Sequence, residues 1–107
     1  MAKGHRKFLD ILDRRPLILD GATGTELQKH GMPAGVCPEM WCIDNPGVIA
    51  GVHGAYARAG SDVVYTCTFG ASRVKLEQYG QADVRSVNRR LARIAKEAVK
   101  GRALVAG

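Results

Sequence analysis

Short apolar segments alternate with amphipathic ones along the chain, and this alternation limits the folds that it can adopt. Residues 17–19 (LIL), 62–69 (DVVYTCTF) and 103–107 (ALVAG) are predicted strands, because they are nearly continuous apolar runs or are rich in β-branched and aromatic residues. Segments with helical periodicity lie between them. Strands that alternate with helices pair in parallel through right-handed crossovers. The sequence therefore predicts an α/β fold with a parallel sheet.

Periodicity and capping residues place the expected helices. Asn45 and Pro46 start one of the two long helices, since asparagine suits the cap and proline the first helical position. Asp83 is suited to cap the other. Residues 32–44 contain two prolines and a glycine without a regular period, so we expect a loop there. The expected helices are residues 5–15, 25–30, 46–59, a short helix ending near residue 80, and residues 84–100.

The last predicted strand has no helix pattern after it. Three strands of a parallel sheet leave two open edges, and a bare apolar strand at a terminus is an aggregation hazard. We therefore expect residues 1–107 to be the N-terminal portion of a larger domain that is incomplete at its C-terminus.

Composition restricts the location and the partners of the chain. No apolar stretch approaches the roughly 20 residues of a membrane-spanning helix, and the charged N-terminus lacks the apolar segment of a secretory signal. A cytoplasmic protein without a membrane partner is expected. Lys and Arg number 16 against 10 acids, but much of this charge lies on residues 84–100 without a nucleic-acid recognition motif. We expect no nucleic-acid partner, although a stand-alone module for a phosphorylated or nucleic-acid ligand stays the alternative function.

Polar residues follow two of the predicted strands. Ligands of parallel α/β folds collect at the carboxyl ends of strands, and Asp20 with the loop Gly21–Gly24 lies at one such end, Thr66 at another. Glycine amides can approach a carboxylate or phosphate, and the Asp20 carboxylate would suit an ammonium group. This pattern is typical of a site for an amino acid. The residues equally allow a purely structural role, in which Asp20 caps the next helix or braces the turn.

The cysteines are odd in number, and without a signal peptide they are expected to be free thiols. Cys37 and Cys42, with His30 and His53, match no standard spacing of a structural zinc site. Cys67, inside a predicted strand, is expected to be a small buried side chain. No metal ligand and no catalytic residue is therefore assigned to this chain.

Four segments of the chain resemble the start of the homocysteine S-methyltransferase family: LILDGATGTELQKHG, CPEMW, NPGVIAGVHGAYARAGSDVVYTCTFGASRVKLEQYG and LVAG. That family includes cobalamin-dependent methionine synthase and betaine–homocysteine methyltransferase. The resemblance covers residues 16–107 and implies a (β/α)₈ TIM barrel, of which this chain would supply about three βα units. It also implies a zinc ion, held by three cysteines, that binds the homocysteine thiol; the thiolate then attacks the methyl group of a donor.

The matching positions imply a substrate pocket. By resemblance, Asp20 contacts the amino group of homocysteine. The amides of Gly21 and Ala22, together with Thr66, hold its carboxylate. Trp41 resembles the aromatic residue of the family's first long loop, and from its place in the sequence alone it could either cover a ligand or fill a gap under the loop.

The zinc-binding cysteines of the family lie in later strands, in a single-cysteine motif and a Gly-Gly-Cys-Cys motif, and neither occurs here. The chain alone is therefore expected to be inactive in methyl transfer. The donors implied by the resemblance are methylcobalamin, methyltetrahydrofolate, betaine and S-methylmethionine. The segment TCTFGASRVKL is closer to the folate and corrinoid methionine synthases than to the betaine enzymes.

Overall fold

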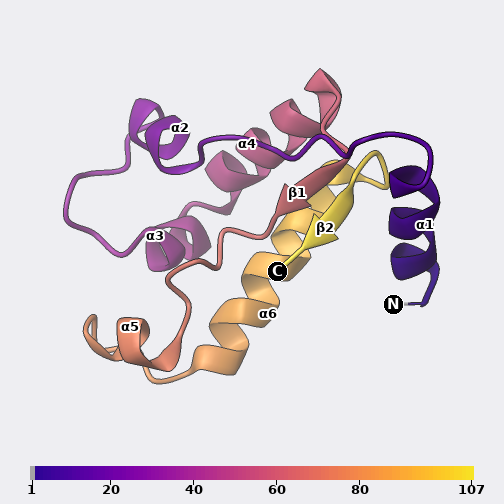
Figure 1. Ribbon diagram of the computed structural model, residues 1–107. Helices are drawn as coiled ribbons and strands as arrows, with labels where there is room; N and C mark the ends of the chain where they lie inside the picture. Colours follow the sequence, from indigo (N-terminus) through magenta and orange to yellow (C-terminus); the bar gives the residue numbers. More distant parts are fainter. Residues whose placement is uncertain (1) are drawn as a thin grey trace.

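Three parallel segments form the sheet region of the chain (Figure 1). The computed structural model describes residues 2–107, with side chains from Lys7 onward. Strand β1 (Val63–Tyr65) pairs in parallel with β2 (Leu104–Ala106), so that Val63 lies opposite Leu104. On the other side of β1, Leu19 forms a single parallel bridge to Val63. The predicted strand at 17–19 is thus present as one bridge, between the first helix and the loop after Asp20.

Helices pack against the strands and lie beyond their ends. Helices α4 and α6 pack together, and β1 contacts α4 while β2 contacts α6. In Figure 1, α3 and α5 lie on the side of the molecule toward which β2 points. The helices are α1 (Ala2–Leu12), α2 (Gly24–Lys29), α3 (Pro38–Asp44), α4 (Pro46–Ala59), α5 (Arg73–Glu77) and α6 (Val84–Val99).

Helix α3 corrects the expectation of a loop over residues 32–44. Pro38 occupies the first turn, where proline is tolerated because its missing N–H would have no helical partner. The helix buries Cys42 and Ile43 against α4 and α6. Short helices depend on tertiary packing rather than on intrinsic propensity, so the pattern of residues 32–44 alone did not reveal this one.

Strand β1 is also shorter than the predicted segment 62–69. Cys67 has φ 57°, in the left-handed region, and this ends the extended conformation after Thr66.

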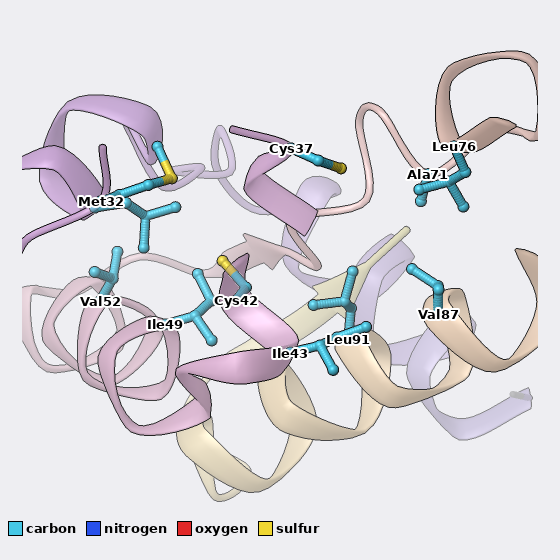
Figure 2. Close-up of a cluster of buried hydrophobic side chains, with 11 residues drawn as sticks. Met32, Cys37, Cys42, Ile43, Ile49, Val52, Ala71, Leu76, Val87 and Leu91 are labelled. Carbon is cyan, nitrogen blue, oxygen red and sulfur yellow. The ribbon is translucent and has the colours of Figure 1, made fainter. Parts of the chain in front are cut away.

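Figure 2 shows the main core cluster, in which side chains from α2, α3, α4, α5 and α6 meet. Leu27, Ile49, Leu76 and Leu91 are all buried to 1% exposure or less. A smaller cluster, of Ala57, Val64 and Val99, lies between the sheet and the two long helices. Together the clusters fix the positions of the strand ends and of α3.

An ion pair holds segment 17–19 against β1. The Arg15 guanidinium donates two hydrogen bonds of 2.7 Å to the Asp62 carboxylate, one to each oxygen. The same carboxylate accepts the Ile18 N–H at 2.9 Å. These donors, Arg15 first, lower the pKa of Asp62 to about 2. The pair thereby fixes the register of the residues that lead into Asp20.

The second edge of β2 has no strand partner among residues 2–107. A cavity of about 790 Å³ lies along this region, lined by β2, by Phe8 of α1 and by Ala92 and Lys96 of α6. None of the helices in this range is both long and apolar enough to cross a membrane.

Candidate functional site

Asp20 lies beside the carboxyl end of β1. Its Oδ2 accepts a hydrogen bond of 3.2 Å from the Tyr65 N–H, and its own N–H donates to Val63 O at 3.0 Å. Partial burial raises the pKa of the Asp20 carboxyl, against the opposing effect of the Tyr65 N–H. The two strand ends are therefore adjacent, as the parallel arrangement predicts.

The loop after Asp20 rests on Tyr56 of α4. The Tyr56 hydroxyl donates to Ala22 O at 2.7 Å. A Cβ on Gly21 would lie 3.0 Å from that hydroxyl oxygen, so a glycine allows the close approach. Gly21 and Ala22 are exposed, and within the described part of the chain their N–H groups donate to no other group. They are free to bind an acidic group of a ligand.

Thr66 is buried and lines a second cavity, of about 540 Å³. This cavity is lined by Thr23, Gly24 and Leu27, by the first residues of α3, by residues 65–69 and by Gly107. The Thr66 N–H is used by β2, because it donates to Ala106 O at 3.0 Å. Its hydroxyl exchanges a hydrogen bond of 2.7 Å with that of Thr68. Thr66 is thus placed to contact a ligand through its side chain and not through its N–H.

The predicted site residues fall into two groups. Asp20, Gly21 and Ala22 lie together at the strand end but do not line the 540 Å³ cavity, whereas Thr66 does. Trp41 lines neither cavity: it lies on α3, half-buried, and packs against the main core. A contact between Trp41 and a substrate stays a prediction.

Glu39 is a pocket residue to which the sequence analysis assigned no role. It is 5% exposed and lines the cavity from α3. Its Oε2 accepts the Gly70 N–H at 3.0 Å, and its Oε1 accepts the Cys37 thiol at 3.5 Å. No cationic side chain among the described ones forms an ion pair with it. The sequence shows an acid directly after Pro38, but because residues 32–44 were predicted to be a loop, the position of Glu39 on a helix was not expected.

Gly70→Ala is expected to lower the free energy of unfolding by about 1–3 kcal/mol, the range for inserting a methyl group into a packed site. A Cβ at Gly70 would lie 2.8 Å from Glu39 Oε1, and this carboxylate is buried and accepts the hydrogen bond from Gly70 itself. Denaturant unfolding measures the change. Gly51→Ala is the control, since its Cβ would meet nothing within 4 Å; equal losses in both variants would contradict the steric explanation.

The described side chains provide no metal site: they contain no group of three or more His, Cys, Asp or Glu residues placed to hold an ion. Two of the three thiols nevertheless lie close together, with Cys42 Sγ 3.8 Å from Cys67 Sγ. Cys37 and Cys42 are buried, and Cys67 is half-buried at the cavity.

Comparison with known proteins decides the family. The family model described as homocysteine S-methyltransferase matches residues 17–107. The chain belongs to the homocysteine S-methyltransferase family. Methionine synthase from Mycobacterium tuberculosis is 35% identical over 83% of this chain, and betaine–homocysteine S-methyltransferase 1 from Rattus norvegicus is 34% identical over 98% of it. The resemblance seen in the sequence is confirmed.

A solved structure of this family has the same arrangement. The metallated form of the homocysteine methyltransferase MmuM from Escherichia coli superposes with a TM-score of 0.76 at 26% identity, over 92% of this chain. The match covers 39% of the MmuM chain, 28% of the betaine enzyme and 8% of the methionine synthase. Our chain thus corresponds to less than half the length of each of these homocysteine S-methyltransferases.

Proposed function

We propose that this chain forms the N-terminal part of the substrate pocket of a homocysteine S-methyltransferase of the methionine synthase type. The enzyme would transfer a methyl group from a donor to the thiolate of homocysteine and so produce methionine. The observation that carries the proposal is the hydrogen bond from Tyr65 N–H to Asp20, because it joins the two strand ends that bear the polar residues. The family match over residues 17–107 supports the same reaction class.

Each polar group at the strand ends has a partner in homocysteine. The Asp20 carboxylate attracts the ammonium group. The N–H groups of Gly21 and Ala22, which have no partner in the described part of the chain, donate to the carboxylate, and the Thr66 hydroxyl adds a donor on the cavity side. An acid next to free amides distinguishes an amino acid from a simple anion, because an anion would be repelled by Asp20.

A (β/α)₈ barrel would complete this pocket. We infer that residues 1–107 are its N-terminal portion, with segment 17–19, β1 and β2 as the first three parallel strands. Two features support this: β2 has an edge without a strand partner in residues 2–107, and Ile18 and Leu19 are 60% and 46% exposed. Further strands would cover such apolar edges.

The metal implied by the family resemblance is zinc, which when bound would keep the homocysteine sulfur as a thiolate. The described residues do not fit it, since no three of their ligating side chains converge. We therefore expect no methyl transfer by this chain alone. The family resemblance allows four methyl donors: methylcobalamin, methyltetrahydrofolate, betaine and S-methylmethionine. A cytoplasmic location stays a prediction.

The test of this proposal is homocysteine binding by the Asp20→Asn variant. Loss of the charge pair is expected to weaken binding about 10-fold, equivalent to about 1.4 kcal/mol. 4-Mercaptobutanoate, which lacks only the amino group, is the matched ligand: it should bind the variant at least as tightly as the unchanged chain, because the exchange removes the repulsion between Asp20 and its carboxylate. Amide shifts of Gly21 and Ala22 in an NMR titration measure both affinities. Unchanged homocysteine affinity in Asp20→Asn would remove this residue from the site.

A further inference from the structure

Two thiols from distant parts of the sequence meet at the wall of the 540 Å³ cavity. Cys42 comes from α3 and Cys67 from the turn after β1, and their sulfur atoms are 3.8 Å apart. Sulfur atoms in a disulfide are about 2.05 Å apart, so side-chain movement of about 1.8 Å would join them. Cys42 is fully buried, whereas Cys67 lines the cavity and is partly exposed.

We propose that Cys42 and Cys67 form a redox-active pair that reacts with low-molecular-weight disulfides and closes reversibly to a disulfide at this cavity. The cavity gives a small reagent access to Cys67 and not to Cys42. Cys67 is therefore the attacking thiol, and Cys42, buried next to it, is the resolving thiol.

The surroundings of the pair favour this division of roles. The hydrogen bond between the two thiols lowers the pKa of Cys67, while the same interaction and burial raise the pKa of Cys42. A thiolate, not a thiol, attacks a disulfide. The partly exposed sulfur is thus also the one whose thiolate is stabilised.

The backbone holds Cys67 in place for this reaction. Its φ of 57° is unusual for a residue other than glycine. Hydrogen bonds on both sides maintain it: Thr66 N–H donates to Ala106 O at 3.0 Å, and Ala71 N–H donates to Thr68 O at 3.0 Å. The position of the sulfur is therefore set by the turn as well as by its contact with Cys42.

The chemistry proceeds in two exchanges. The Cys67 thiolate attacks one sulfur of a disulfide RSSR; a Cys67–SR bond forms, the S–S bond of the reagent breaks, and RS⁻ leaves and takes a proton from water. Cys42 then passes its proton to water, and its thiolate attacks Cys67 Sγ; the bond from Cys67 to SR breaks, and the second RS⁻ leaves and takes up a proton from water. Two cysteine thiols are oxidised and one RSSR is reduced to two RSH.

Cys37 provides a matched control within the same region. It is 6% exposed, does not line the cavity, and donates its S–H to Glu39 Oε1 at 3.5 Å. Burial raises its pKa. It should therefore stay reduced under conditions in which the pair reacts.

The test treats the reduced full chain with bis(2-hydroxyethyl) disulfide and measures intact mass and linkage after an acid quench. The unchanged chain and Cys37→Ser are expected to lose two hydrogen atoms without an adduct, and dithiothreitol should restore them. Cys42→Ser should keep one mercaptoethanol adduct on Cys67, and Cys67→Ser should keep none. Cleavage after Glu39 separates Cys37 from Cys42, so peptide mapping identifies the linked pair in the unchanged chain.

Three results would overturn the proposal: a stable adduct without closure in the unchanged chain, a linkage that includes Cys37, or no reaction with the reagent. Peptide mapping of the unchanged chain shows which two cysteines are linked even if a serine variant fails to fold. Repeating the reaction in urea gives the reference for an unfolded chain, in which all three thiols should react without selectivity.

Discussion

Acidification is expected to destabilise this chain through His53, with a loss of about 2–3 kcal/mol of unfolding free energy between about pH 6.5 and about pH 4. His53 lies on α4, is 1% exposed, and its Nε2 has no hydrogen-bond partner among the described residues. Burial lowers its pKa from 6.5 to about 4. The unfolded chain binds a proton in this window while the folded chain does not, so the stability is complete above pH 6.5 and falls as the pH is lowered.

Urea unfolding over this pH range measures the effect, and His53→Leu is the control. Leucine cannot titrate and leaves no unpaired ring nitrogen, so the slope of stability against pH should flatten between about pH 6.5 and 4. The ion pair of Asp62 affects only the lower end of this window, because its contribution to stability is lost as the pH falls from about 3.8, the ordinary pKa, toward about 2. An unchanged slope in His53→Leu would assign the acid sensitivity to another group.

The sequence predicted the elements whose pattern is local. Helix α6 follows from the spacing of Val87 and Leu91 and from Asp83, whose Oδ1 accepts the Ser86 N–H at 3.1 Å. The parallel order of the strands follows from their alternation with helices, and the MmuM superposition supports the α/β arrangement. Helix α3 was not predicted, because its stability comes from burying Cys42 and Ile43 against helices that are distant in sequence.

The candidate site was likewise predictable only in part. The adjacency of Asp20 and Tyr65 could be predicted, because the carboxyl ends of neighbouring parallel strands lie at one edge of a sheet. The supports of that edge could not: Tyr56 reaches Ala22 across 34 residues, and Glu39 reaches Gly70 across 31. Such contacts depend on the packing of α3 and α4, which no local pattern encodes.

Replacing Glu39 with alanine is expected to lower the free energy of unfolding by about 2–4 kcal/mol, since it removes a buried acceptor and leaves a space. The Gly70 N–H would lose its partner at 3.0 Å, and the Cys37 thiol its partner at 3.5 Å. Loss of this contact releases the turn after β1 from α3. Denaturant unfolding of the variant measures the change.

Glu39→Gln separates the hydrogen bond from the charge. Glutamine has nearly the same volume, and its amide oxygen can still accept the Gly70 N–H, so most of the stability should return if that hydrogen bond is the main contribution. Homocysteine affinity of the same variant then shows whether the charge serves the pocket. Affinity equal to that of the unchanged chain would leave Asp20 as the acid that binds the ammonium group. The two carboxylates lie at different places, because Asp20 accepts the Tyr65 N–H and Glu39 accepts the Gly70 N–H. A loss of stability in Glu39→Gln as large as in Glu39→Ala would contradict the hydrogen-bond explanation and identify the negative charge itself as the stabilising feature.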